Sequence, residues 1–144
     1  MKNMISRTIA MMGLFFALAV GGVQAQTPTR TEADIPFDFA AGKSTLKAGS
    51  YAIRVRGNAL SIRTADGKKT VLVNAPLSIG SRDRKGGARL VFNRYGDLYF
   101  LSQVWWSSDS GRQVFPSESE SRAREFQFSK GVKSERVEVA VRSN

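Results

Sequence analysis

The chain has 144 residues, with 22 basic and 12 acidic side chains, no cysteine and no histidine, and its formal net charge at pH 7 is +10. Without cysteine it has no disulfide, no thiol nucleophile and no thiolate metal site. Without histidine, catalytic triads that use histidine, zinc hydrolases and two-histidine metal sites are excluded.

The first 25 residues have the pattern of a signal peptide. Lys2 and Arg7 precede the apolar run IAMMGLFFALAVGGV, and VQA supplies the compact residues that a signal peptidase reads. A membrane anchor is the alternative, but the run has only about 15 residues and a spanning helix needs roughly 20. We expect cleavage after Ala25 and an exported protein, periplasmic or secreted, with no transmembrane anchor left. The net charge would then be +8, because Lys2 and Arg7 leave with the leader.

Residues 26–33 are polar and have no hydrophobic period, so we expect a flexible lead-in there, followed by one β-domain over residues 34–144. In DIPFDF, alternate residues from Ile35 to Phe39 share one face. The proline of this segment cannot donate to a ladder, which indicates an edge strand or a strand whose proline side is free. AAGKS then predicts a turn.

Two hairpin signals follow. SYAIRVR alternates cleanly, so its aromatic and branched residues face inward while Arg54 and Arg56 project outward. The next two residues, GN, form a two-residue hairpin signal, and ALSIRT resumes the alternation. DG marks the turn before KTVLVNA, which predicts a further strand.

Residues 76–87 are expected to form a loop that ends in a basic cluster. ARLVFNRY and LYFLSQVWW flank a Gly-Asp turn and predict a third hairpin. The second strand is apolar on both faces, with Phe100 and Val104 on one side and Tyr99, Leu101 and Trp105 on the other. This pattern is typical of a strand that is covered on both sides.

A helix is expected near the C-terminus, over residues 118–126. Ser117 and Glu120 have the spacing of a capping box, in which serine is the N-cap and glutamate stands three residues on. The alternative is that REFQFS alternates as a strand. ERVEVAVR closes the chain as a strand with its three valines facing inward.

Together these segments predict a mainly β fold. We expect a single antiparallel β-barrel or curved β-sandwich of about seven strands, with one short helix before the last strand. The helix would plug or cover an open end.

Four segments resemble motifs of a group of small, functionally uncharacterised exported bacterial proteins. IPFDF, TLKAGSY and LVFNRYGDLYFLSQVW match an IPFxF opening, an LxAGxY turn and an RYGxxYFL hairpin. In SGRQVFPSESESRAREF, VFPSE stands where the group often has Leu-Pro before a charged helix. The resemblance covers most of the chain after the leader and implies export and the fold, but no activity.

Two patterns suggest catalysis but fit structural roles better. GKS at residues 42–44 ends like a P-loop, yet Phe37 stands where the first glycine belongs. Ser44 and Lys47 fit S-x-x-K, but the companion motifs of such serine enzymes are absent, and on an extended chain Lys47 would not reach Ser44. We therefore expect no enzyme and no catalytic residue; a histidine-free hydrolase is a distant alternative.

The acidic residues do not indicate a metal or cofactor site. Asp34 and Asp38 would lie roughly 13 Å apart on one strand face, wider than a pair of glycosidase carboxylates. Glu118 and Glu120 fit the start of a helix, where the helix dipole favours negative charge. These two glutamates and Glu125 belong to no calcium-binding loop.

Basic residues and two tryptophans form the candidate binding surface. Exposed basic side chains attract anions, less strongly as salt increases. An exposed tryptophan beside glutamine could stack on a sugar ring or lie at a membrane interface, with core packing as the alternative. Nucleic acid is not expected, because no aromatic platform lies on a basic strand face. The candidate residues are Arg54, Arg56, Arg63, Arg82, Arg84, Lys85, Arg89, Gln103, Trp105 and Trp106.

We therefore expect an exported, non-enzymatic β-domain that binds an anionic envelope lipid, a polysaccharide or another envelope protein through its basic outer strands. A surface that merely keeps the protein soluble is the simpler alternative. A lipocalin-like carrier is another, with an apolar ligand near Tyr51, Phe92 and Phe100. Side chains of this size can instead fill a small barrel.

Overall fold

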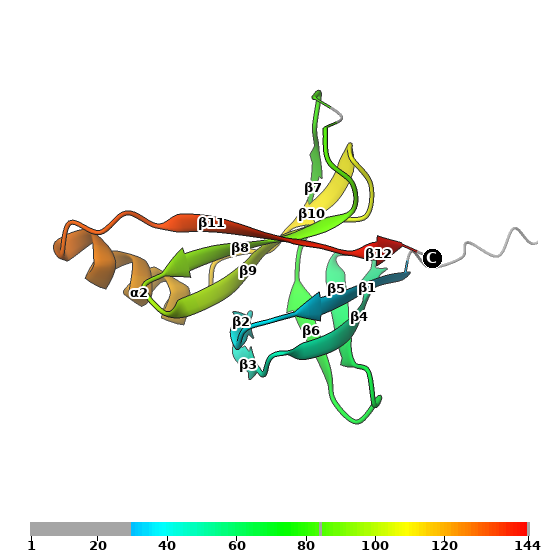
Figure 1. Ribbon diagram of the computed structural model, residues 1–144, viewed down its shortest axis with the longest axis horizontal. Coiled ribbons are helices and arrows are strands. Elements are labelled where there is room, and N and C mark those ends of the chain that lie inside the picture. The colour runs from blue at the N-terminus through cyan, green and yellow to red at the C-terminus, as the bar shows by residue number, and fades with distance from the viewer. Residues whose placement is uncertain (1–29, 84, 144) are drawn as a thin grey trace, which may run out of the picture.

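The computed structural model describes residues 30–83 and 85–143; the expected leader, its cleavage site and Arg84 lie outside these ranges. Within them the chain forms twelve strands and one helix (Figure 1). In chain order the elements are β1 (Arg30–Ile35), β2 (Phe39–Ala41), β3 (Ser44–Leu46), β4 (Gly49–Arg56), β5 (Ala59–Thr64), β6 (Thr70–Asn74), β7 (Leu77–Gly80), β8 (Arg89–Tyr95), β9 (Leu98–Trp105), β10 (Ser110–Gln113), α2 (Glu118–Ser129), β11 (Glu135–Ala140) and β12 (Arg142–Ser143).

The strands form two sheets. The five-stranded sheet has the order β12-β1-β4-β5-β6. The seven-stranded sheet has the order β11-β8-β9-β10-β7, and β2 and β3 attach to it through β9. Neither sheet closes on itself within the described residues. The predicted mainly β fold is confirmed, with the sandwich in place of the barrel.

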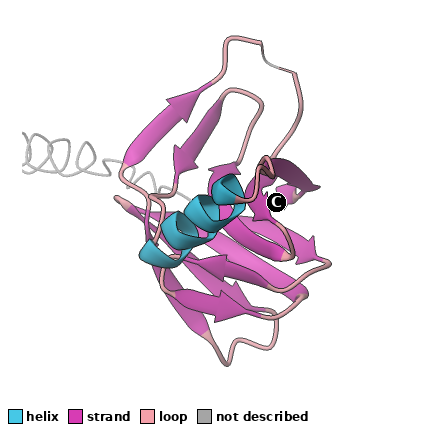
Figure 2. Ribbon diagram, turned by 90° about the vertical axis from the view of Figure 1, so that its left-hand side faces the viewer, coloured by secondary structure: helices cyan, strands magenta, loops and turns pink. Residues whose placement is uncertain are grey.

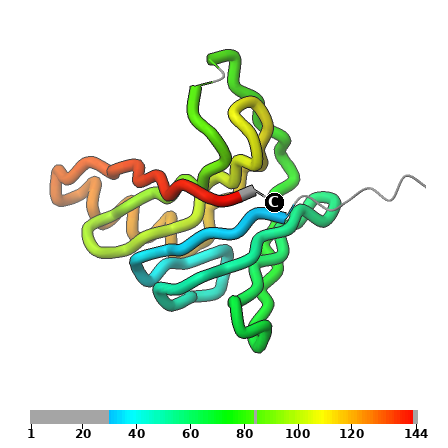
Figure 3. The backbone as a smooth tube through the Cα atoms, turned by 45° about the vertical axis from the view of Figure 1, so that its right-hand side comes forward, coloured from blue at the N-terminus to red at the C-terminus, as the bar shows by residue number. Residues whose placement is uncertain are grey.

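The chain crosses between the sheets four times. It leaves the first sheet after β1, bends at Phe37 and enters the second as β2. It returns to the first sheet as β4 and passes to the second again after β6. Its last crossing is made by β11 and β12, which run as one long ribbon across both sheets (Figure 1). Figure 3 shows β1 beside the C-terminal strand, and these two strands pair antiparallel at Thr31 with Ser143.

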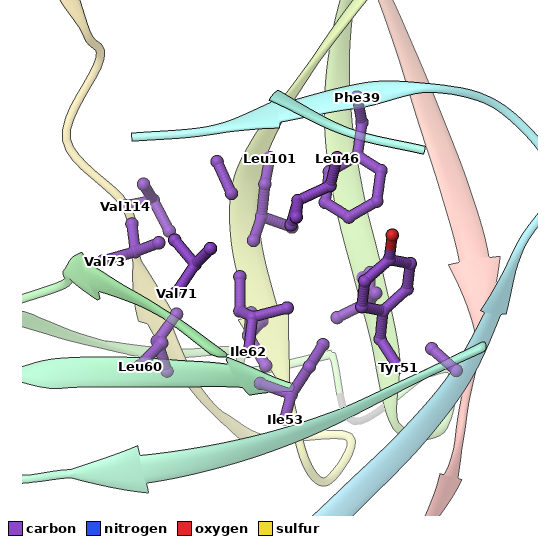
Figure 4. Packing of buried hydrophobic residues seen from close by; sticks show 14 of the residues in the cluster. Phe39, Leu46, Tyr51, Ile53, Leu60, Ile62, Val71, Val73, Leu101 and Val114 are labelled. Atoms are coloured by element: carbon purple, nitrogen blue, oxygen red, sulfur yellow. The ribbon is translucent and has the colours of Figure 1, made fainter. Parts of the chain in front are cut away.

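The core lies between the sheets and is filled by side chains (Figure 4). Phe39 makes edge-to-face contacts with the rings of Tyr51 and Phe92, at 5.4 Å between ring centroids in both cases. Tyr51 and Phe92, two of the residues named for a carrier cavity, therefore pack against the same ring. The third, Phe100, lies on the opposite face of β9 and packs against Tyr95.

The first strand begins earlier than predicted. Residues 30–33, expected to be part of a flexible lead-in, pair with β4 on one side, and β1 pairs with β12 on the other. Thr31 and Ala33 face the core and are buried, at 2% and 4% exposure. Small and polar residues give little hydrophobic signal, so the strand depends on partners that are distant in the sequence.

Two strands were not predicted. β7 occupies part of the expected loop at 76–87, and β10 begins in the segment SSDSGR, for which no element was predicted. The two pair with each other antiparallel and extend beyond the rest of the sandwich (Figure 1). β10, with the sequence SGRQ, has no apolar side chain to signal a strand, and β7 has only two, Leu77 and Ile79.

Because β9 contains a β-bulge, the prediction of which residues share a face of this strand is partly wrong. Val91 pairs with Gln103 and Phe92 with Leu101, so Ser102 is an extra residue in the ladder. Beyond such a bulge the alternation changes phase. Val104 therefore joins Leu101 on the core face, and Trp105 joins Phe100 on the outer face, contrary to the prediction. The strand is nevertheless covered on both sides, as expected.

The helix lies across the outer face of the seven-stranded sheet (Figure 2). It extends to Ser129, so the strand alternative for REFQFS is wrong. Ser117 is the N-cap, and its hydroxyl accepts from the amide of Glu120 at 3.2 Å. Glu120 does not complete a capping box; its side chain turns to the sheet. Within the described residues, no helix has the length and apolar character needed to cross a membrane.

Candidate functional site

Five arginines line a groove on the outer face of the five-stranded sheet. The groove has a volume of about 790 Å³ and lies on the side of β4 opposite the buried side chain of Ile53. Its lining includes Arg54, Arg56 and Arg63, which the sequence places on the outer face of one hairpin. Arg30 of β1 and Arg142 of β12 join them. The basic surface therefore extends over four strands.

The ladder register arranges this surface in rows. Across β12, β1, β4 and β5, the first row consists of Arg142, Glu32, Ala52 and Arg63. Across β1, β4 and β5, the second consists of Arg30, Arg54 and Ser61. Cross-strand neighbours stand side by side on one face. Short side chains at Ala52 and Ser61 therefore lie among long guanidinium side chains and form the floor of the groove.

Acidic side chains of the groove already have partners. Glu32 forms an ion pair with Arg30 at 2.6 Å, and both side chains are about half exposed. Asp34 accepts a hydrogen bond from the hydroxyl of Ser50. Asp66 accepts from the Thr64 hydroxyl and the Lys68 amide, and these hydrogen bonds, the Thr64 one foremost, lower the pKa of its carboxyl. Asp66 therefore stays ionised at neutral pH.

Four of the five arginines have no such partner. Among the described residues, Arg54, Arg56, Arg63 and Arg142 form no ion pair and no side-chain hydrogen bond. A guanidinium stays protonated at any physiological pH. The groove thus presents four arginines without an acidic partner around a shallow floor, and its five arginines exceed its three acidic residues, Glu32, Asp34 and Asp66, by two charges. A net positive lining is suited to binding anionic groups.

The other basic candidates lie elsewhere. Arg82 and Lys85 are exposed in the loop after β7, at the tip of the β7–β10 arm. Arg84 lies outside the described residues. Neither Arg82 nor Lys85 lines the groove. The basic cluster of this loop is a separate part of the surface.

Arg89, Gln103 and Trp105 form a packed cluster on the outer face of the seven-stranded sheet. The guanidinium carbon of Arg89 lies 4.7 Å from the centre of the Trp105 ring, and Arg89 also pairs with Glu138 at 3.6 Å. The indole N–H of Trp105 donates to Gln103 at 3.0 Å. Trp105 is only 6% exposed. These residues support the sheet, and of the two tryptophans only Trp106, which is half-buried, is open to solvent.

The stretch IPFDFAAGKSTLKAGSY forms a corner that is held together by hydrogen bonds. Asp38 accepts from Lys47 Nζ at 2.8 Å and from the Ala48 amide at 2.9 Å. These bonds, the Lys47 one foremost, lower the pKa of Asp38, and Asp38 in turn raises the pKa of Lys47. The Tyr51 hydroxyl donates to the carbonyl of Lys47 at 2.6 Å. Lys47 is therefore held by Asp38 and not by Ser44.

Glu120 is buried, which the sequence did not indicate. It is 5% exposed and accepts from Asn93 Nδ2 at 2.9 Å and from the Tyr95 hydroxyl at 3.4 Å. Burial, and secondarily the negative charge of Glu120, raises the pKa of Tyr95. The carboxylate thus fastens α2 to β8. Within the described residues, no three acidic side chains gather closely enough to hold a metal ion.

No protein-family model, no curated protein and no solved structure matches this chain. The groove is thus interpreted from its own geometry and charge. The sequence did not indicate Arg30 and Arg142 as binding residues, because Arg30 lies in the expected lead-in and Arg142 lies at the end of the last strand. The available signal for Arg30 was its place beside Thr31, which is buried, and for Arg142 its place beside Val141, which packs against the core.

Proposed function

We propose that this protein is an exported, non-enzymatic β-domain that binds an anionic component of the cell envelope through the arginine groove. The observation that carries the proposal is the set of four arginines without acidic partners around Ala52 and Ser61. A surface that only keeps the protein soluble does not need several arginines in one groove, because dispersed charges of both signs are sufficient for solubility.

The spacing of the arginines favours a ligand with several negative groups. Arg54 and Arg56 stand two residues apart on β4, which is about 6.8 Å along a strand. Arg142 and Arg63 lie at the two ends of one row, three strand spacings or about 14 Å apart. A polyanion or a charged lipid surface can contact several of these side chains at once, and a single small anion cannot.

The shape of the groove supports the same reading. Its floor is backbone and short side chains, so a ligand can approach the sheet closely. The guanidinium groups at the rim can each form paired hydrogen bonds with phosphate or carboxylate oxygens. Because these contacts are solvent-accessible, we expect binding to weaken strongly as salt increases.

The direct test is retention of the protein on anionic surfaces. We expect the chain that starts at Gln26 to sediment with phosphatidylglycerol vesicles, or to be retained on alginate, at low salt and to be released at high salt. Phosphatidylcholine vesicles serve as the neutral reference. Retention on neither anionic probe at low salt would contradict the proposal.

A pair of matched double variants separates the groove from net charge. Arg54→Gln/Arg63→Gln should weaken retention by about tenfold or more, since it removes two charge-assisted contacts from the site. Arg82→Gln/Lys85→Gln removes the same charge from the β7–β8 loop and should leave retention nearly unchanged. Equal losses in the two variants would show that binding follows overall charge and not the groove.

A further inference from the structure

A second cavity lies where the β7–β10 arm meets the tip of the β4–β5 hairpin. It has a volume of about 320 Å³, which is at the lower end of the range for small-molecule sites. Its walls come from both sheets: Val55 from β4, Ile79 from β7, Trp106 after β9, and Arg112 from β10. None of these four residues lines the arginine groove.

Arg112 points into the end of the sandwich. It pairs with Val104 across the β9–β10 ladder, and Val104 is a core residue with 1% exposure. Cross-strand partners project from the same face of a sheet. The guanidinium group is therefore on the core side of β10, at the point where the core ends and the cavity begins.

One edge of this guanidinium is unpaired. Its Nη1 donates to the carbonyl oxygen of Pro76 at 3.0 Å, which fixes the plane of the group. Its Nε is buried and has no hydrogen-bond partner, and Arg112 forms no ion pair with any described residue. Its Nη2 also has no hydrogen-bond partner among the described residues but is not buried, so Nη2 is the donor that a molecule in the cavity can reach. A carboxylate at Nη2 would form a charge-assisted hydrogen bond, which is favourable.

The remaining walls suit an apolar group. Trp106 is half-buried, and it lies on the opposite side of the chain from the packed Trp105. Val55 is partly buried against the core. Ile79 pairs with Gly111, the ladder partner of Trp105, so its side chain projects from the other face of the arm. Trp106 and Val55 thus provide an aromatic face and one branched aliphatic side chain beside a single positive charge.

We propose that this cavity binds a small monocarboxylate with an apolar body, such as a medium-chain fatty acid or an aromatic acid. The carboxylate would accept a hydrogen bond from Nη2 of Arg112, and the apolar body would lie against Trp106 and Val55. One arginine neutralises one negative charge. A phosphate dianion would leave excess charge beside apolar walls, which is unfavourable.

The test uses octanoate as the probe and two-dimensional ¹H–¹⁵N NMR of the unbound protein as the starting point. Saturable shifts are expected for the Nε–H signal of Arg112 and the indole N–H signal of Trp106. Octanol, which lacks the charge, and acetate, which lacks the chain, should each bind at least about tenfold more weakly. No saturable shift with octanoate, or equal binding of octanol, would overturn the proposal.

Variants identify the site. Arg112→Gln should weaken octanoate binding by about tenfold or more, whereas Arg82→Gln, an exposed arginine of the same arm, should not change it. Because Arg112→Gln also removes the hydrogen bond to the carbonyl of Pro76, Ser78→Phe provides a second route: it fills the cavity from an exposed position and leaves Arg112 intact. Undiminished binding in both folded variants would place the ligand elsewhere. The groove variant Arg54→Gln/Arg63→Gln should bind octanoate normally, which separates this site from the proposed polyanion surface.

Discussion

The indole ring of Trp105 lies directly against the backbone of Gly111, its partner in the β9–β10 ladder. A Cβ atom at Gly111 would come within 2.9 Å of Cδ2 of Trp105 and 2.7 Å of the carbonyl oxygen of Val104. Arg89 approaches the same indole at 4.7 Å. The glycine therefore allows the tryptophan to cover the backbone of β10, and this contact ties the β7–β10 arm to the sheet.

We expect Gly111→Ala to lower the free energy of unfolding by about 1–3 kcal/mol, because the ring or the strand must move to admit the methyl group. Gly87→Ala is the control, since a Cβ there meets nothing within 4 Å and the backbone does not need glycine. Urea denaturation of both variants measures the difference. Equal stabilities of the two variants would show that Trp105 can shift without cost.

The buried carboxylate of Glu120 should contribute more to stability than its exposed neighbour. We expect Glu120→Ala to cost about 1–3 kcal/mol, because Asn93 and Tyr95 lose their acceptor at a buried position. Glu120→Gln keeps an acceptor oxygen and should cost less. Glu118→Ala is the control, because Glu118 also lies in the first turn but forms only an exposed pair with Arg122, for which about 0.5 kcal/mol is expected. Thermal unfolding of the three variants measures the difference. A larger loss of stability in Glu118→Ala than in Glu120→Ala would contradict this prediction.

The Asp38 carboxylate should make stability depend on acidic pH. Its pKa is lowered in the folded protein by Lys47 and then by the Ala48 amide. The unfolded chain therefore binds the proton first as pH falls, and the stabilisation is fully present above the ordinary value of 3.8 and decreases below it. Asp38→Asn should be less stable than the parent at neutral pH, and the difference should shrink in the range below pH 3.8.

This pH effect can be measured by urea denaturation at a series of pH values. Lys47→Met is the informative companion variant, because it removes the foremost cause of the pKa shift and leaves the hydrogen bond from Ala48. It should reduce the acid dependence without abolishing it. A difference between Asp38→Asn and the parent that stays constant through the acidic range would show that the carboxylate is not responsible.

Glu32 should oppose polyanion binding. It lies in the middle of the first row of the groove and pairs with Arg30 at 2.6 Å. Glu32→Gln removes this negative charge and releases Arg30, so retention on anionic vesicles should increase by about threefold to tenfold. Glu135→Gln makes the same change in net charge in the other sheet, where Glu135 pairs with Arg94. A larger increase with Glu135→Gln would contradict a role for the groove.

The sequence predicted those strands, turns and helix ends that form because of residues close by in the chain. The alternation of β4 and β5 and the turn at Gly57, with its φ of 57°, follow from side-chain periodicity and from the freedom of glycine at positive φ. The start of α2 at residue 118 follows from the Ser117 cap. Each of these causes acts within a few residues of chain.

The elements that the sequence did not predict depend on distant partners. β1 extends to Arg30 because it gains β4 and β12 as neighbours, and β10 forms because it pairs with β7 and β9. The bulge at Ser102 arises from the β8–β9 ladder and reverses which face Trp105 occupies. A one-residue change of phase is invisible in a strand that is apolar on both faces.

The amino-acid sequence by itself determined that this chain lacks thiol and imidazole chemistry, that it alternates into strands, and that Arg54, Arg56 and Arg63 project from one outer face. Only the tertiary structure decided that Arg30 and Arg142 join these arginines and that Glu32 lies in the middle of the first row. It also decided that Arg112 and Trp106 line the same cavity at the end of the core. The reason is physical: periodicity fixes the side of a strand on which a residue lies, but pairing between distant strands fixes its neighbours.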